Sequence, residues 1–334
     1  MPGIKKIKIG CDLFLNLKLY HLPEKMLLSL QKQYPDIEII PVNVPQSPNI
    51  QSNLDIYWGN RITAEIIENC KNLKWIHFGS VGTNRARTKS VISRNITVTS
   101  SQGLVIAPMV ASALSFITGL ARGLHYSYAL RNKYCLNREN FDAIFDEVQE
   151  LEKQKILIVG LGDVGQRLAK VCVALGMEVI GIKQNISEKI PYVKQLHSLN
   201  ELAECVTDSD FIINLLPLTT KTEQIFNNNV FAKMKSSAFF INIGRGETVD
   251  EETLISVLKN KSIAGAGLDV FAVEPLSVNS PLWDMDNVML SPHVAGLSSK
   301  YWERQLELFS FNLQQYLMNN FTDMRNIVDM SKAI

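Results

Sequence analysis

Apolar and polar positions follow a regular order in the second half of the chain. Short apolar runs are separated by stretches in which apolar residues recur every three or four positions, as in 166–175 and 251–260. The runs predict six strands, at 156–159, 178–182, 211–216, 238–243, 264–270 and 288–290. Strands that alternate with helices indicate a parallel sheet with right-handed crossovers, and six strands are typical of the doubly wound dinucleotide-binding fold.

The first hundred residues predict a smaller α/β unit. Short β-rich runs at 7–10 and 37–42 flank a helical pattern at 23–34, and another strand is expected at 54–59. Beyond residue 292 the pattern is helical again, at 301–317. The polar and aromatic segment 123–152 fits neither sheet, so we expect an arm that packs on a second subunit.

Composition narrows the class of protein without pointing to a function. The chain has 334 residues, enough for two domains, with 46% hydrophobic and 20% charged residues, as in a soluble globular protein. A net charge of +1 without a charged tail argues against nucleic acid or a membrane surface as partners. Five dispersed cysteines lack metal-type spacing, so we expect reduced thiols, a cytoplasmic protein and no metal.

One uncharged stretch, 95–121, is long enough to be compared with a membrane span. Pro108 and the preceding serine-rich and glycine-containing sequence interrupt its first half, and Ser112, Ser115 and Thr118 fall in its second half. We therefore expect a buried helix that begins near residue 107, not a membrane span.

A glycine-rich turn follows the first strand of the second half. Gly160, Gly162 and Gly165 form G-x-G-x-x-G between the strand at 156–159 and a helical pattern. In such a turn the first glycine permits the bend, the second allows the pyrophosphate to approach the backbone, and the third allows the helix to pack on the strand. The free N–H groups and dipole at the helix start would then bind phosphate. The competing interpretation is an ordinary tight strand-to-helix turn.

The residues after the second strand lack the acid that usually binds the ribose hydroxyls of NAD. Lys183 follows the strand, Gln184 and Asn185 supply no carboxylate, and Glu178 lies too early, at the start of the strand. A lysine can attract a 2′-phosphate, which favours NADP(H) as the cofactor. Lys183 could equally be a solvated residue at the rim of the pocket.

Three polar residues stand just past predicted strand ends. Arg245 follows the strand 238–243, Glu274 follows 264–270, and His293 follows 288–290. Ligands of open parallel sheets bind beyond the carboxyl ends of the strands, so we expect all three to face one crevice. Arg245 offers a planar fork to a carboxylate, His293 can donate a proton to a carbonyl oxygen as hydride reaches carbon, and Glu274 can stabilise the protonated ring.

Each of these residues also has a simpler interpretation. Arg245 could cap a helix or pair with Asp250. Glu274 followed by proline is common turn chemistry. A lone histidine is more often a surface or hydrogen-bonded core residue than an acid catalyst. Their joint occurrence at three strand ends favours catalysis.

The chain resembles the D-isomer-specific 2-hydroxyacid dehydrogenases, best from 155 to 296. The sequences GLGDVG, LLPLTTKTEQIF, INIGRGETVDEETL, AGAGLDVFAVEPL and SPHVAG are similar to that family's blocks and occur in the same order. The resemblance implies that Arg245 binds the substrate carboxylate and that His293 is the acid/base. Glu274 would orient the histidine and favour its protonated form. In HFGSVGTN, the backbone N–H groups of Ser80, Val81 and Gly82 would also bind that carboxylate.

The resemblance further implies the architecture and the cofactor residues. A flavodoxin-like substrate domain would comprise 1–100 and 298–334, with a Rossmann dinucleotide-binding domain, 101–297, inserted into it. It implies a homodimer and NAD(P)(H) as cofactor. The candidate cofactor-binding residues are Gly160, Gly162, Asp163, Val164, Gly165, Lys183, Pro217, Thr222, Ile243 and Asp269.

The sequence departs from the family pattern at Lys183 and at Ser112, where many members have a glutamate expected to bond across the hinge. Two other functions compete with reduction of small 2-oxo acids such as glyoxylate, hydroxypyruvate, pyruvate or phosphohydroxypyruvate. Formate dehydrogenases share the architecture, but they carry glutamine where this chain has Glu274. Corepressor-like nucleotide sensors retain the three catalytic residues, and absence of turnover would distinguish them.

Overall fold

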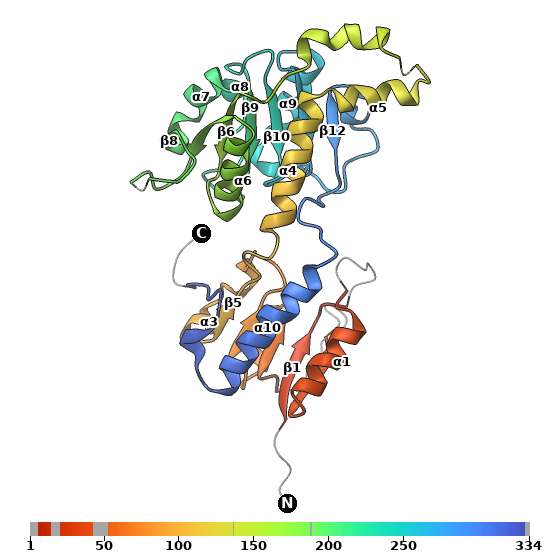
Figure 1. Ribbon diagram of the computed structural model, residues 1–334. Helices are drawn as coiled ribbons and strands as arrows, with labels where there is room; N and C mark the ends of the chain where they lie inside the picture. Colours follow the sequence, from red (N-terminus) through yellow and green to blue (C-terminus); the bar gives the residue numbers. More distant parts are fainter. Residues whose placement is uncertain (1–5, 15–20, 43–52, 136, 188, 331–334) are drawn as a thin grey trace, which may run out of the picture. The chain divides into compact units, whose positions relative to one another are not determined.

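The computed structural model describes residues 6–14, 21–42, 53–135, 137–187 and 189–330 (Figure 1). It divides into two compact units, the first formed by 1–105 and 298–334 and the second by 106–297. Residues 1–5 and 331–334, at the two ends of the predicted substrate domain, lie outside the described residues.

The first unit contains a parallel five-stranded sheet with the order β2-β1-β3-β4-β5, the flavodoxin-like order. This confirms the predicted fold class of the smaller unit. Its strands are β1 (Ile7–Cys11), β2 (Ile37–Pro41), β3 (Ile56–Trp58), β4 (Trp75–His77) and β5 (Thr97–Thr99). Its helices are α1 (Glu24–Gln33), α2 (Ala64–Asn69), α3 (Lys89–Ser93) and α10 (Tyr301–Leu317).

Alternate residues of these strands supply two separate cores. Trp58 and Trp75 contact α10, where the ring of Phe309 stacks on both, with centroids 3.8 and 5.1 Å away. Tyr57 and Ile76, which point to the other face, pack with α2 and α3. The C-terminal helix therefore completes the core that the N-terminal strands begin.

The second unit contains a parallel seven-stranded sheet with the order β12-β11-β10-β9-β6-β7-β8. Counted from β6, the order is that of the doubly wound fold with one further strand, and it reverses between β6 and β9. Its strands are β6 (Lys155–Val159), β7 (Glu178–Ile182), β8 (Gln195–His197), β9 (Phe211–Asn214), β10 (Phe239–Asn242), β11 (Gly265–Leu268) and β12 (Val288–Leu290). The fold class is confirmed, but the expected strand number of six was wrong, because β8 is too short and polar to give a recognisable pattern.

Helices cover both faces of this sheet. The inward side chains of α4 and α6 pack on one face, and those of α7, α8 and α9 pack on the other. The helices are α4 (Ile106–Ala121), α5 (Leu124–Asn132), α6 (Asp163–Ala174), α7 (Leu202–Cys205), α8 (Asn228–Phe231) and α9 (Glu251–Lys259). Short 3₁₀ helices are η2 (Asn84–Ala86), η3 (Glu139–Glu147), η4 (Leu199–Glu201), η5 (Val206–Asp208), η6 (Gly246–Thr248), η7 (Pro281–Asp284) and η8 (Phe321–Asp323).

The second part of the uncharged stretch forms α4, whose Ala113, Ile117 and Leu120 are buried in the core of the second unit, while its first part contains β5. Within the described part of the chain, no single helix is long and apolar enough to cross a membrane. The α4 and α5 segments meet such a length and composition test only together, with a bend of 72° between them.

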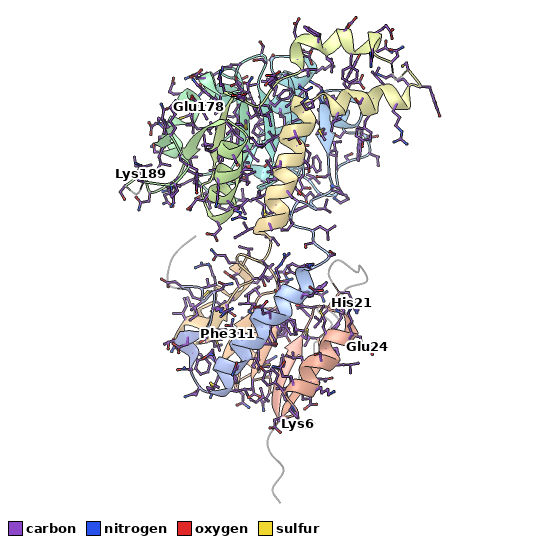
Figure 2. All side chains as sticks on the ribbon, in the orientation of Figure 1. Lys6, His21, Glu24, Glu178, Lys189 and Phe311 are labelled. Carbon is purple, nitrogen blue, oxygen red and sulfur yellow. The ribbon has the colours of Figure 1, made fainter. Side chains whose placement is uncertain are left out.

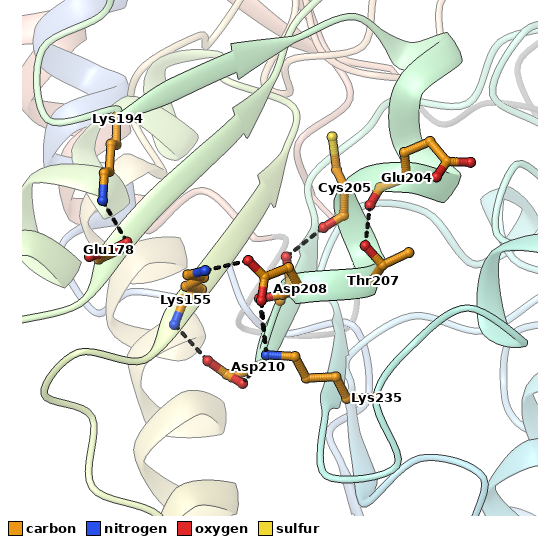
Figure 3. A network of polar contacts seen from close by, with 10 residues as sticks. Lys155, Glu178, Lys194, Glu204, Cys205, Thr207, Asp208, Asp210 and Lys235 are labelled. Carbon is orange, nitrogen blue, oxygen red and sulfur yellow. Dashed lines mark hydrogen bonds and ion pairs between the residues drawn. The ribbon is translucent and has the colours of Figure 1, made fainter.

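A network of ion pairs joins the amino ends of β6 and β9 (Figure 3). Asp210 accepts hydrogen bonds from the backbone N–H of Lys155 at 2.8 Å and from Lys235 Nζ at 2.8 Å. Asp208 pairs with Lys155 Nζ and, at 3.6 Å, with Lys235 Nζ. These contacts fix the strands at the edge opposite to the loops that carry the candidate site.

A buried histidine lies in the first unit, at the carboxyl end of β4. His77 Nδ1 is 2.7 Å from Thr99 Oγ1, and its Nε2 is 3.2 Å from the side-chain nitrogen of Gln305 on α10. Burial lowers the pKa of His77 to about 3. The ring is therefore neutral in the folded protein at ordinary pH.

The depressed pKa predicts a pH-dependent stability. Between pH 6.5 and 3 the unfolded ring binds a proton that the folded ring does not, so His77 contributes stability above pH 6.5 and loses it as the pH falls toward 3. The slope expected from one such proton is about 1.4 kcal/mol per pH unit. Urea unfolding of wild type and His77→Gln at pH 7, 5.5 and 4.5 should show this slope only in the wild type.

Tryptophan fluorescence suits this measurement because Trp58, Trp75 and Trp302, three of the four tryptophans, lie in the first unit. Equal slopes for both proteins would show that His77 is not the group responsible.

Candidate active site

The three glycines after β6 have three different surroundings. Gly160 has a φ of +107°, and a β-carbon there would lie 3.1 Å from the backbone of Leu215. A β-carbon on Gly165 would lie 2.4 Å from Gly160 O, so α6 can approach β6 only with glycine at this position. Around Gly162, in contrast, no described heavy atom lies within 4 Å of an added β-carbon. These are the bend, the close packing and the open backbone that a pyrophosphate cradle requires.

The start of α6 is suited to receive an anion. Gly162 is its N-cap residue and supplies no side chain to the first N–H groups. Asp163 and Val164 begin the helix, and Gly162 and Asp163 are exposed. The start of α6 therefore presents backbone N–H groups of the kind that bind phosphate oxygens.

The remaining cofactor candidates also lie just beyond strand ends of the same sheet. Lys183 follows β7 and is half-buried, with its backbone N–H bonded to His197 O at 3.1 Å. Thr222 is buried and its hydroxyl donates to Pro217 O at 2.6 Å, which closes the turn after β9. Ile243 is buried at the end of β10.

Figure 2 marks Glu178, which opens β7 at the end of the strand remote from Lys183. Its carboxylate pairs with Lys194 at 2.9 Å. Glu178 is therefore engaged with Lys194 at the other end of the strand, and Lys183 is the charged residue that directly follows β7.

Two buried asparagines shape the loops after β9 and β10. Asn214 donates to Asn242 Oδ1 at 3.0 Å and to Thr248 Oγ1 at 2.7 Å. Asn242 Oδ1 also accepts from Gly244 N–H at 3.1 Å, and Asn214 Oδ1 accepts from Leu216 N–H at 3.0 Å. Sequence reasoning missed these positioning residues. Their signal was an asparagine at the last position of two otherwise apolar strands, FIIN and FFIN.

The structure brings Glu274 and His293 together. His293 Nδ1 lies 2.7 Å from Glu274 Oε2, while Glu274 Oε1 accepts from Phe271 N–H at 3.2 Å. The imidazole and carboxylate are half-exposed, with 49% and 35% of their side-chain surfaces accessible. Because Nδ1 is engaged by the carboxylate, Nε2 is the nitrogen left to exchange a proton with a ligand.

Asp269, at the end of β11, supports the loop that carries His293. Its carboxylate is buried and accepts from Ser291 Oγ at 2.5 Å and from the N–H groups of Val294 and Ala295, both at 2.9 Å. Its backbone carbonyl accepts from His293 N–H at 2.7 Å. These bonds hold His293 at a φ of +55°, an uncommon conformation for a residue other than glycine.

Arg245 is exposed on the neighbouring loop after β10. Its Nη1 donates a hydrogen bond to the backbone carbonyl oxygen of the preceding residue, Gly244, at 2.7 Å. Arg245 makes no ion pair with any residue that the structure describes. Asp250, the partner that the simpler interpretation proposed, caps α9 through Thr253 N–H at 3.2 Å. A β-carbon on Gly246 would lie 1.9 Å from the backbone of Phe271, so the Arg245 loop directly contacts the loop that leads to Glu274.

Ser112, where many members of the family have a glutamate, contacts the loop that carries His293. Ser112 Oγ on α4 donates to Ala295 O at 3.1 Å, two residues beyond His293. The short side chain therefore anchors the histidine loop within the second unit.

The predicted carboxylate loop lies in the first unit, after β4. Three consecutive backbone carbonyls at its start accept hydrogen bonds. Phe78 O accepts from Ser101 Oγ at 2.6 Å, and Ser80 O accepts from Ser101 N–H at 3.0 Å. Gly79 O accepts from Tyr301 OH. Val81 and Gly82 are exposed, and their N–H groups have no hydrogen-bond partner among the described residues.

Arg61, which lies three residues beyond the end of β3, contacts Asp12. Its Nη2 donates to Asp12 O at 3.0 Å, and its Nε lies 3.8 Å from Asp12 Oδ2. Asp12 is buried and also accepts from the N–H groups of Asn60 and Arg61 and from Tyr57 OH. Arg61 therefore holds the ends of β1 and β3 together.

Comparison with known proteins identifies the family of the chain. Residues 114–295, more than half of the chain, match the family model described as D-isomer specific 2-hydroxyacid dehydrogenase, NAD binding domain. A glyoxylate reductase of Thermofilum pendens is 31% identical over 258 residues, which cover 76% of this chain and 75% of that protein.

Solved structures agree over nearly the whole chain. A protein of Thermus thermophilus superposes with a TM-score of 0.81 at 25% identity, covering 97% of this chain and 100% of that one. An NADPH-dependent glyoxylate/hydroxypyruvate reductase from Sinorhizobium meliloti, solved with NADP and sulfate, gives a TM-score of 0.76 at 25% identity, covering 97% and 99%.

Proposed function

The chain belongs to the D-isomer specific 2-hydroxyacid dehydrogenase family, and from this premise we propose that it reduces small 2-oxo acids with NADPH, using Arg245, Glu274 and His293. It is an NAD(P)-dependent oxidoreductase of 2-hydroxy and 2-oxo acids, as the resemblance implied. The observation that carries the assignment of residues is the 2.7 Å contact between His293 Nδ1 and Glu274 Oε2.

Each residue has one task in this proposal. A bound reduced nicotinamide supplies the hydride. His293 Nε2 donates a proton to the carbonyl oxygen of the substrate, while Glu274 fixes the ring through Nδ1 and stabilises its protonated form. Arg245, which has no carboxylate partner among the described residues, receives the substrate carboxylate as a planar fork. The N–H groups of Ser80, Val81 and Gly82 are assigned to the same carboxylate.

The residues present fit a dinucleotide. Gly162 leaves open space at the start of α6, so this helix start would hold the pyrophosphate. Lys183 would hold a 2′-phosphate at the end of β7, where neither Gln184 nor Asn185 offers a carboxylate to a ribose hydroxyl. The Sinorhizobium meliloti relative is described as NADPH-dependent, which supports the preference for NADP(H).

A spectrophotometric panel tests both parts of the proposal. Glyoxylate, hydroxypyruvate and pyruvate are each supplied with NADH and with NADPH, and we expect turnover with a preference for NADPH. Lys183→Gln should reduce that preference about tenfold, because it removes one charge-assisted contact to the 2′-phosphate. Lys189→Gln, an exposed lysine beyond the same strand (Figure 2), is the matched control.

A clear preference for NADH would contradict the role given to Lys183. Tight cofactor binding without turnover of any 2-oxo acid would instead favour a nucleotide sensor. Activity with formate alone would favour a formate dehydrogenase, against which Glu274 argues.

The proposed working form is a cytoplasmic homodimer. Within 123–152, Tyr128, Tyr134 and Phe145 expose 60%, 98% and 75% of their surfaces. Large exposed aromatic side chains on one segment are typical of a surface that a partner covers. Light scattering coupled to gel filtration should give twice the mass of the chain, and a monomeric mass would contradict the proposed dimer.

A further inference from the structure

Glu251, the first residue of α9, contacts the segment that leads from β11 to Glu274. Its Oε2 accepts a hydrogen bond from the backbone N–H of Ala272 at 2.9 Å. Glu251 follows β10 in the chain, whereas Ala272 follows β11, 21 residues later. The bond therefore joins two segments that lie beyond the ends of neighbouring strands.

The N–H group next to that of Ala272 is bound by Glu274 itself. Phe271 N–H donates to Glu274 Oε1 at 3.2 Å, and Glu274 Oε2 lies 2.7 Å from His293 Nδ1. One oxygen of this carboxylate is thus held by the turn 271–274, and the other contacts the imidazole. The place of the Glu274 carboxylate therefore depends on the position of the turn, and Glu251 holds the turn from outside.

The loop after β10 packs closely on the same turn. A β-carbon on Gly246 would lie 1.9 Å from Phe271 C and 2.6 Å from Ala272 N, so the two segments meet backbone to backbone. Glu251 adds a directional hydrogen bond to this contact, which the packing of backbone atoms does not supply.

The stretch that ends at Glu251 is itself fixed by hydrogen bonds. Thr248 donates to Arg245 O through its N–H at 3.3 Å and through its Oγ1 at 2.6 Å. Val249 N–H donates to Gly246 O at 2.9 Å. Glu251 therefore extends from a backbone segment with a defined position, and its carboxylate can hold the turn in one place.

We propose that Glu251 is a positioning residue for the reduction. It fixes the turn 271–274 and, through this turn, the carboxylate of Glu274 that orients the His293 ring. This rests on the proposed function, in which His293 donates the proton. Glu251 acts through Glu274, so its loss leaves the three residues of the site in the chain and relaxes the alignment of two of them. The rate of the chemical step should therefore fall while the affinity for the cofactor is retained.

Substitutions that remove or keep the acceptor test this role. Glu251→Ala should lower kcat about 10-fold, with the 2-oxo acid that wild type reduces fastest and NADPH, because a small displacement of a proton donor slows the reaction. The Kd for NADPH, measured by fluorescence titration, should not change. Glu251→Gln keeps an oxygen acceptor at the same distance from the backbone and should restore most of kcat. Glu251→Asp is shorter by one methylene group and should not restore it.

Glu252→Ala is the matched control. Glu252 is exposed and carries the same charge in the same first turn of α9, so its replacement has the same effect on the charge at the helix start. We expect wild-type kcat from this variant and a similar melting temperature for both alanine variants. An equal loss of kcat in Glu251→Ala and Glu252→Ala would show that charge at the helix start, and not the bond to Ala272, is responsible.

A double-mutant cycle distinguishes positioning through Glu274 from a general structural effect. In a Glu274→Gln background, Glu251→Ala should lower kcat by less than about twofold, because the carboxylate that it positions is already gone. A full 10-fold loss in that background would overturn the inference, as would undiminished kcat in Glu251→Ala. Absence of wild-type turnover with every 2-oxo acid would instead overturn the proposed function. Glu251→Asp supplies the same comparisons if the alanine variant does not fold.

Discussion

Replacing His293 with asparagine is expected to abolish turnover, with a loss in kcat of at least about 100-fold, while cofactor binding is retained. General acid catalysis contributes about 10²- to 10⁴-fold, and asparagine cannot donate a proton from a titrating ring. Asparagine is the appropriate substitute because His293 has a φ of +55°, which asparagine tolerates better than most residues. Steady-state kinetics and fluorescence titration with NADPH give the two readouts.

Glu274→Gln provides the comparison for this variant. It retains the imidazole but replaces the carboxylate that contacts Nδ1 at 2.7 Å, so the loss should be smaller and the pH profile of kcat should change. Undiminished activity of His293→Asn would contradict the role of the histidine. Loss of NADPH binding in the same variant would show that His293 holds the cofactor and not only the proton.

The second large effect is expected from the glycine turn, where two alanine substitutions should fail in different ways. Gly162→Ala adds a methyl group into open space at a negative φ, so the fold should keep its stability while the pyrophosphate loses its close approach. We expect NADPH affinity to fall by about 10- to 100-fold, or about 1.4 to 2.8 kcal/mol. Gly165→Ala places its methyl group 2.4 Å from Gly160 O and should destabilise the second unit by about 1–3 kcal/mol.

Thermal unfolding without cofactor and titration with NADPH separate the two variants. A Gly162→Ala protein with unchanged NADPH affinity would mean that the cofactor phosphates bind elsewhere. An unchanged melting temperature for Gly165→Ala would mean that α6 can move away from β6 at little cost.

The strands and helices of the second unit were easier to predict from the sequence than those of the first unit. Its strands are apolar runs bounded by glycine and polar residues, and its longer helices repeat with a clear period, because a doubly wound sheet is buried on both faces. The three-residue strands β4, β5 and β8 were missed, whereas β3 and β12, which are equally short, were predicted. A strand of three residues is too short to show a period of its own, so such segments are recognised only in part. Their pairing is decided by neighbouring strands and not by their own pattern.

For the candidate site, the sequence indicated residue types but few of the contacts that the structure shows. Arg245, Glu274 and His293 were chosen from their positions after strand ends, and a contact between Glu274 and His293 was expected from their chemistry. The buried hydrogen bonds of Asn214, Asn242 and Asp269 were not predicted. A polar residue at a strand end gives the same sequence pattern whether its side chain contacts a ligand or stabilises a loop.

By itself the sequence determined the fold class, the dinucleotide turn and the family, because periodicity and motif spacing are local properties that a linear chain displays directly. Only the tertiary structure decided that Arg61 is held by Asp12, that Ser112 anchors the histidine loop, and that Glu251 bonds to the turn that follows β11. Whether a charged side chain is satisfied depends on residues that are distant in the chain and become neighbours only when strands and helices pack. That information belongs to the folded arrangement, and no local pattern contains it.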